Sequence, residues 1–137
     1  MPVRSLHSSV LAWPRRHEVE AAVTGWARDL ARLMPELAAV GFFGSYARGD
    51  WGVGSDIDLI MVLDKSSSPF GYRTVARGNV RLPVPSDHFI YTRDELVTLL
   101  ERGGRFADTL RREVIWVFTR DDLPGQFLHL PHDGQSL

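Results

Sequence analysis

The sequence predicts an α/β fold, with a small, mixed, twisted sheet of about four strands and flanking helices. Short apolar runs that end in turn residues alternate with segments whose apolar residues recur every three or four positions. The chain has 137 residues, and 44% of them are hydrophobic, which is enough for a core. We expect the helices to pack chiefly on one face of the sheet, and a functional turn with carboxylates to lie at the other.

Four short apolar runs predict the strands. Each run is bounded by residues that favour turns, such as Gly, Ser or Pro, and the segment between the first two runs is rich in glycine. The predicted strands are residues 38–43, 56–63, 88–91 and 114–118.

Apolar residues recur at helical spacing in much of the remaining chain. The first helix carries a stripe of apolar residues that includes Trp26, and it ends near Pro35. Thr92, followed three residues later by Glu95, forms a capping box that opens a later helix. The predicted helices are residues 15–34, 46–49, 93–100 and 101–112, the last following the Gly103-Gly104 break. Residues 70–79 fit either a short helix or an irregular crossover.

The amino-acid composition excludes several kinds of functional site. The chain has no cysteine, so disulfides, thiolate metal sites and cysteine nucleophiles are excluded, and any metal must be held by oxygen or imidazole. The formal net charge is −1, which offers no basic surface for long nucleic acids. No apolar run approaches the roughly 20 residues that span a bilayer. We therefore expect a cytoplasmic protein that binds no membrane.

One domain is the expected organisation. It comprises residues 1–137, with a core at about 15–118 and a segment at 119–137 that is either a tail or a docking segment.

Two aspartates are placed for metal binding. Asp56 and Asp58 lie two positions apart on a predicted strand, so both carboxylates share one face of the sheet. At roughly 5–6 Å their charges would repel by about 3 kcal/mol at an effective dielectric of about 20. A divalent cation removes this repulsion, and oxygen ligands favour Mg²⁺ or Mn²⁺. The alternative is a surface turn with two solvated acids.

A turn that suits an anion precedes this pair. Gly44 and Ser45 lie where a buried strand enters a short helix, so backbone N–H groups and a hydroxyl are available to a phosphate. Arg48 follows three residues later. It either reaches the same phosphates or pairs with Asp50 on the surface.

A third carboxylate is expected on a neighbouring strand, because in-line displacement between two metals needs a further ligand. Asp87 is the candidate, since it opens the strand at residues 87–91. Its alternative role is to cap a turn. Asp64 is a poorer choice because it lies at the far end of the second strand.

The motif resembles a known family. Residues 44–49, Gly-Ser-Tyr-Ala-Arg-Gly, and residues 55–59, Ser-Asp-Ile-Asp-Leu, are similar to the signature of the nucleotidyltransferases related to DNA polymerase β, in particular the minimal nucleotidyltransferase (MNT) antitoxins. The likeness covers about residues 18–118. It implies that Gly44 and Ser45 bind a nucleoside triphosphate.

The resemblance also implies catalytic and metal-binding roles for Asp56, Asp58 and Asp87, which would hold two Mg²⁺ ions. The implied activity is transfer of a nucleoside monophosphate, AMP from ATP, to an acceptor hydroxyl. Few residues follow the last strand, so we expect the acceptor on another chain or a second copy, with a HEPN-type toxin as the leading partner. The alternatives are a non-catalytic antitoxin module and an adenylyltransferase for small molecules such as aminoglycosides.

Overall fold

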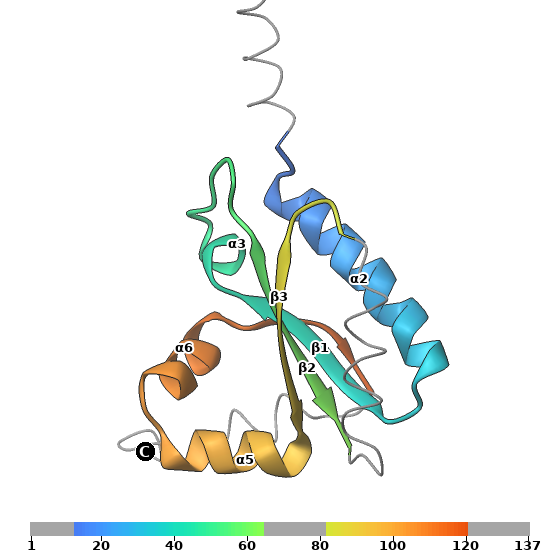
Figure 1. The fold of residues 1–137 in the computed structure, drawn as a ribbon, viewed down its shortest axis with the longest axis vertical. Coiled ribbons are helices and arrows are strands. Elements are labelled where there is room, and N and C mark those ends of the chain that lie inside the picture. Colours follow the sequence, from blue (N-terminus) through green and yellow to red (C-terminus); the bar gives the residue numbers. More distant parts are fainter. Residues whose placement is uncertain (1–12, 65–81, 121–137) are drawn as a thin grey trace, which may run out of the picture.

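The computed structural model describes residues 13–64 and 82–120 (Figure 1). Within these ranges the fold is a four-stranded sheet with helices on both faces. In chain order the elements are α2 (Arg16–Leu33), β1 (Leu37–Phe43), α3 (Ser45–Arg48), β2 (Ile57–Leu63), β3 (Ser86–Thr92), α5 (Arg93–Arg102), α6 (Arg105–Glu113) and β4 (Ile115–Thr119).

The sheet is mixed, as predicted. Its strand order is β3-β2-β1-β4, with β1 antiparallel to both β2 and β4 and with β2 parallel to β3. The two central strands are almost completely buried, which explains why the sequence of β1 is apolar at every position. Because β2 and β3 are parallel, both strands begin at the same end of the sheet.

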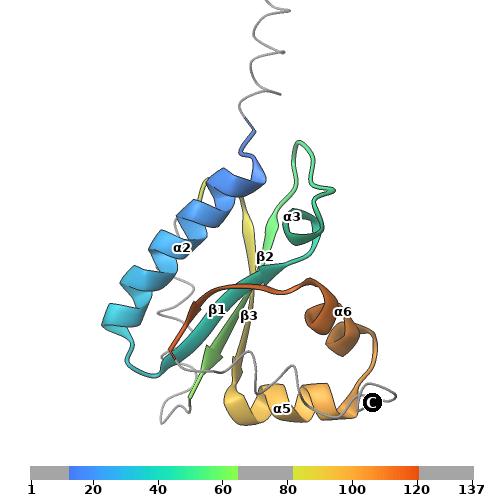
Figure 2. The same cartoon turned by 180° about the vertical axis from the view of Figure 1, so that it is seen from behind.

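Helices cover both faces of the sheet, so the expectation that they pack chiefly on one face is wrong (Figures 1 and 2). Helix α2 packs on one face through Val23, Leu30 and neighbouring residues, against alternate residues of β2 such as Leu59. Helices α5 and α6 pack on the other face, against Ile60 and Val62. The reason is the alternation along β2: its consecutive apolar residues supply both faces, and each face needs a cover.

The predicted elements are confirmed, with their ends shifted by one or two residues, except that α6 begins at Arg105, directly after the Gly103-Gly104 break and four residues after its predicted start at 101. Thr92 accepts the N–H of Glu95 and the Glu95 carboxylate accepts the N–H of Thr92, which is the expected capping box at the start of α5. Strand β4 runs to Thr119, one residue past the predicted end of this strand at 118, and the Arg120 side chain donates to the Leu37 carbonyl.

Two parts of the predicted organisation cannot be compared with the structure. The crossover at residues 70–79 and the segment after Asp121 lie outside the described residues. Among the residues that are described, no helix is both long enough and apolar enough to cross a membrane.

Candidate functional site

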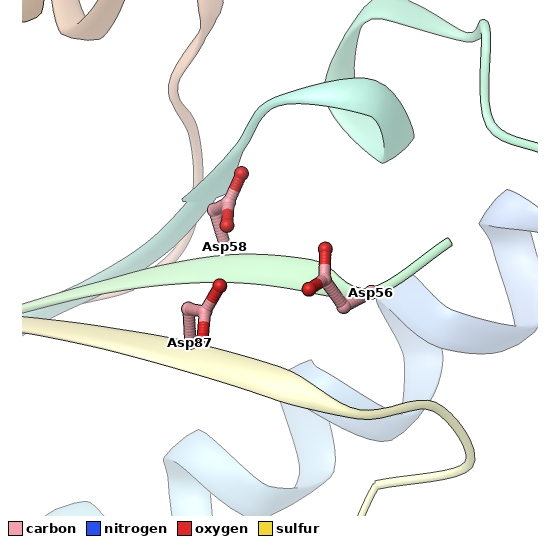
Figure 3. Close-up of side chains that lie close together, drawn as sticks. All are labelled: Asp56, Asp58 and Asp87. Atoms are coloured by element: carbon pink, nitrogen blue, oxygen red, sulfur yellow. The ribbon is translucent and has the colours of Figure 1, made fainter. Parts of the chain in front are cut away.

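Three carboxylates meet at one end of the sheet (Figure 3). Asp58 lies in β2 directly beside Asp87 of the parallel strand β3, and Asp56 precedes β2 by one residue. Because side chains alternate along a strand, Asp56 and Asp58 project from the same face as Asp87. One carboxylate oxygen from each residue lies within 4.8 Å of the others. The parallel pairing of β2 and β3 therefore brings together the three acids that were predicted from the sequence.

The charges of these acids are not balanced by a contacting cation. Asp56 and Asp87 are exposed, Asp58 is half-buried, and none of them forms an ion pair in residues 13–64 or 82–120. Burial is the first cause that raises the pKa of Asp58, from 3.8 to about 6, and the charges of Asp56 and Asp87 add to it. The three acids thus repel one another when no cation is bound.

The turn at Gly44 lies against Asp58. A β-carbon built on Gly44 would lie 2.3 Å from Oδ2 of Asp58, so only glycine allows this approach. The Gly44 backbone also has a φ of +83°, which a side chain disfavours. Both observations require glycine at the junction of β1 and α3.

Helix α3 starts at this turn. Gly44 is its N-cap, and the Gly44 carbonyl accepts the N–H groups of Ala47 and Arg48. The first N–H groups of a helix have no carbonyl partner within the helix, and they favour a negatively charged group. The structure therefore sets the predicted anion-binding turn beside the acidic cluster.

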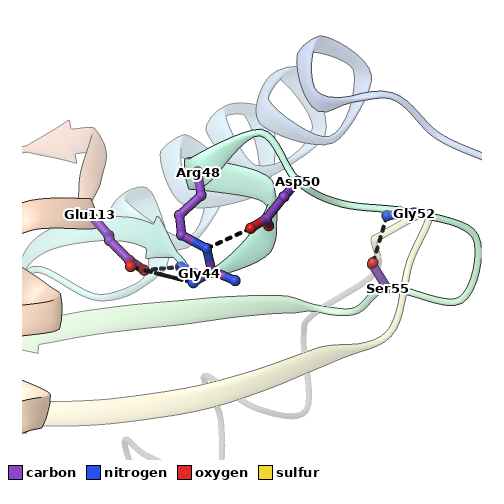
Figure 4. A network of polar contacts seen from close by, with 6 residues as sticks. All are labelled: Gly44, Arg48, Asp50, Gly52, Ser55 and Glu113. Carbon is purple, nitrogen blue, oxygen red and sulfur yellow. Dashed lines mark hydrogen bonds and ion pairs between the residues drawn. The ribbon is translucent and has the colours of Figure 1, made fainter.

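Arg48 is engaged by two carboxylates (Figure 4). Its Nε donates to Asp50 at 3.0 Å, and its Nη1 donates to both oxygens of Glu113 at 3.2 and 3.3 Å. These hydrogen bonds raise the pKa of the Arg48 guanidinium, and the bond to Asp50 has the larger effect. The surface pairing with Asp50, one of the two alternatives for Arg48, is therefore present, whereas phosphate binding stays a prediction.

Glu113 is the residue at this site that sequence reasoning missed. It ends α6, and besides contacting Arg48 it accepts the N–H of Gly44 at 3.1 Å. Gly44 and Glu113 are 69 positions apart, and no motif links them. The only signal in the sequence is an acid at the last position of a helix, where the helix dipole disfavours negative charge.

The family model of the nucleotidyltransferase domain matches residues 26–108, which is more than half of the chain. The chain belongs to this family. The predicted family resemblance and the predicted enzyme class, a nucleotidyltransferase, are thereby confirmed.

Two solved structures share the fold of this nucleotidyltransferase. A candidate nucleotidyltransferase from Sulfolobus solfataricus has a TM-score of 0.58 at 20% identity, over 83% of this chain and 90% of that one. A mutant of the MntA-HpeT toxin–antitoxin has a TM-score of 0.50 at 15% identity, over 80% of each chain. No curated protein matches the sequence.

The loop that joins α3 to β2 is anchored to the core of the nucleotidyltransferase. The rings of Tyr46 and Trp51 stack with centroids 5.4 Å apart, and Tyr46 is fully buried. The Tyr46 hydroxyl accepts a hydrogen bond from Trp13 and donates one to the Pro14 carbonyl. Tyr46 and Trp51 therefore hold the short helix and the following loop in place beside the carboxylates.

Proposed function

We propose that this nucleotidyltransferase moves AMP from ATP to a hydroxyl group on a partner protein, in a reaction that depends on Mg²⁺. The observation that carries the proposal is the placement of three carboxylates within 4.8 Å of one another, beside a turn in which only glycine fits. A triphosphate bound at such a turn has its phosphates next to the acidic cluster. The two features together suit phosphoryl chemistry better than either does alone.

The acidic cluster fits a pair of hard divalent cations. Asp56, Asp58 and Asp87 offer only carboxylate oxygens, which Mg²⁺ prefers and Mn²⁺ accepts, and no cation of the described chain contacts them. The raised pKa of Asp58 indicates that its negative charge is unfavourable without such an ion. In this proposal Asp56 and Asp58 hold both ions, and Asp87 completes the ligand set. Bound Mg²⁺ would supply charge stabilisation at the reacting phosphate.

The turn residues bind the triphosphate. Gly44 lets the phosphates approach the backbone, and Ser45 offers a hydroxyl and an N–H at the start of α3. Arg48 is half-exposed, and its remaining Nη2 is directed to the β- and γ-phosphates in this proposal. Pairing with Asp50 and Glu113 does not prevent this role, because a guanidinium has five N–H donors.

The chemical step is an in-line displacement at the α-phosphorus. The acceptor oxygen forms a bond to this phosphorus as the bond to the bridging oxygen of the β-phosphate breaks, and pyrophosphate leaves. Asp87 accepts the proton of the acceptor hydroxyl, since its carboxylate is exposed and lies beside Asp58.

The openness of the site favours a protein acceptor. Asp56 and Asp87 are exposed, whereas a small sugar is normally held in a concave pocket that buries most of its surface. A tyrosine on a HEPN-type toxin is the proposed acceptor. This part of the proposal draws on the MNT-like motif and on the fold shared with the MntA-HpeT toxin–antitoxin.

The test is transfer of label from ATP labelled on its α-phosphate, in the presence of Mg²⁺. The acceptors are the protein encoded by the neighbouring gene and, separately, an aminoglycoside. We expect an adenylyl group on a tyrosine of the partner, found by mass spectrometry, and a loss of at least about a thousandfold in rate with Asp58→Asn. Label on the aminoglycoside alone would replace the protein acceptor by a small molecule. A partner that is neutralised without being labelled would favour the non-catalytic antitoxin.

A further inference from the structure

Glu113 supports the turn from the side opposite the acidic cluster. Strand β1 lies between β2, which carries Asp58, and β4, which Glu113 precedes by two residues. The last pair of the β1 and β4 ladder is Phe42 with Ile115, so two residues further along the chain the backbone N–H of Gly44 has no partner in β4. The Glu113 carboxylate accepts this N–H at 3.1 Å. The Glu113 side chain thus continues the ladder next to the first residue of β4.

The same carboxylate also fixes Arg48. Both oxygens of Glu113 contact Nη1 of Arg48, while Asp50 holds Nε (Figure 4). The Glu113 side chain is only 13% exposed, whereas that of Asp50 is 62% exposed, so Glu113 is the better shielded of the two acids. One largely buried residue therefore ties the first residue of the turn to the last residue of α3.

We infer that Glu113 is a positioning residue for nucleotidyl transfer, an inference that rests on the proposed function. It holds Gly44 at the close approach to Asp58 and aims the guanidinium of Arg48 from behind. Hydrogen bonds to a carboxylate are stronger than neutral ones, and those that are shielded from water lose less to screening. The turn and Arg48 are thus preorganised before a nucleotide arrives.

Glu113 could instead compete with the phosphates, since it accepts an N–H at the start of a helix. The geometry favours support. The N–H of Gly44 points toward β4, whereas its β-carbon position points to Asp58 of β2. A triphosphate that shares ions with the acidic cluster approaches from the β2 side, so it need not displace Glu113.

The test uses the whole protein with Glu113→Ala, Glu113→Gln and the control Glu101→Gln. Glu101 is an exposed acid of α5, so its substitution makes the same change in charge away from the turn. The first readout is the amide signal of Gly44 and its hydrogen exchange by NMR, without nucleotide. The second is the affinity for a non-hydrolysable ATP analogue with Mg²⁺ by calorimetry, including Arg48→Ala and the double variant with Glu113→Ala.

If Glu113 positions the turn, Glu113→Ala shifts the Gly44 amide signal, speeds its exchange and weakens analogue binding about tenfold. Glu113→Gln retains an acceptor for Gly44 but loses the charge facing Arg48, so it weakens binding about threefold. Losses from Glu113→Ala and Arg48→Ala combine to less than their product, because one contact is shared. Glu101→Gln changes neither readout.

Two results would overturn the inference. The first is a variant of Glu113 that binds the analogue as tightly as wild type or more tightly, since a competitor of the phosphates behaves in that way. The second is a Gly44 signal that Glu113→Ala leaves unchanged. If Glu113→Ala does not fold, Glu113→Gln still decides the first point. If wild type binds no analogue, the proposed function is what fails, and the Gly44 signal still reports whether Glu113 holds the turn.

Discussion

The two ends of strand β2 carry acids in opposite circumstances. Asp64, just past its last residue, pairs with Arg93 of α5 and donates its backbone N–H to the Glu36 carbonyl at 2.8 Å. Asp58, at the other end, lies among Asp56 and Asp87 and forms no ion pair with the described part of the chain. The same strand thus has one balanced acid and one unbalanced acid.

We propose that this difference separates a structural acid, Asp64, from a functional one, Asp58. At Asp64 the partner is part of the fold, so its charge is satisfied whether or not a ligand is bound. At Asp58 the fold adds burial and two neighbouring acids, which raise its pKa to about 6. In the proposed function, the cation that balances these charges comes from outside the chain.

The largest expected effect concerns the end of β2 at which Asp58 has no ion-pair partner. Mg²⁺ together with a non-hydrolysable ATP analogue should stabilise wild type more than the sum of their separate effects, because each supplies charge that the other needs. At a hundredfold excess over the dissociation constant the stabilisation is about 2.7 kcal/mol. Asp56→Asn should abolish this cooperative part, as measured by thermal unfolding. Asp64→Asn is the matched control at the other end of β2.

Purely additive shifts in wild type would contradict the assignment of the cluster as a metal and nucleotide site. A cooperative shift that survives in Asp56→Asn would instead remove this residue from the ligand set.

The next effect tests the close approach of the turn. Gly44→Ala places a methyl group 2.3 Å from the Asp58 carboxylate on a backbone with φ of +83°. Gly49→Ala has a similar φ of +91° with no atom within 4 Å of the new methyl group, so it carries the backbone strain alone. We expect losses of about 2 kcal/mol for Gly44→Ala and about 1 kcal/mol for Gly49→Ala in chemical denaturation.

Nucleotide affinity is a second measurement that distinguishes Gly44→Ala from Gly49→Ala. Gly44→Ala should lose binding of the ATP analogue, and Gly49→Ala should retain it. Equal stability losses in the two variants would mean that the turn does not lie against Asp58 in solution.

The sequence was sufficient for the features that depend on local spacing. The alternation of a strand places Asp56 and Asp58 on one face, and the apolar runs locate the four strands found in residues 13–64 and 82–120. Asp87 was found because chemistry requires a further acid and a strand begins there. The first two conclusions need only the residues within one element and a general property of strands, whereas the choice of Asp87 also needed the chemistry of a metal site.

The sequence was insufficient where distant elements meet. The contact of Glu113 with Gly44 depends on the packing of α6 and β4 beside β1, across 69 positions. The cover of both sheet faces was missed for the same reason, since an amphipathic helix shows that it has an apolar face but not which side of a sheet receives it. Local spacing was enough to suggest the pair of Arg48 with Asp50, but it could not reveal the second carboxylate on Arg48, that of Glu113.

The smallest effect compares Asp58 and Asp64 directly, by the dependence of stability on pH without metal. The folded protein raises the pKa of Asp58 from 3.8 to about 6, so folding favours its protonated form. Its contribution to stability is therefore full below pH 4 and is lost as the pH rises through 6. Asp58→Asn removes this loss and should be more stable than wild type by about 1 kcal/mol at pH 7.5 in EDTA, less than the full pKa shift implies because Asp58 is partly solvated. The advantage should vanish at pH 4.

Asp64→Asn should instead lose about 0.5 kcal/mol at pH 7.5, because it breaks the pair with Arg93. Urea unfolding of the three proteins at both pH values measures these differences, and an Asp58→Asn variant less stable than wild type at pH 7.5 would show that the charge of Asp58 is already balanced within the fold.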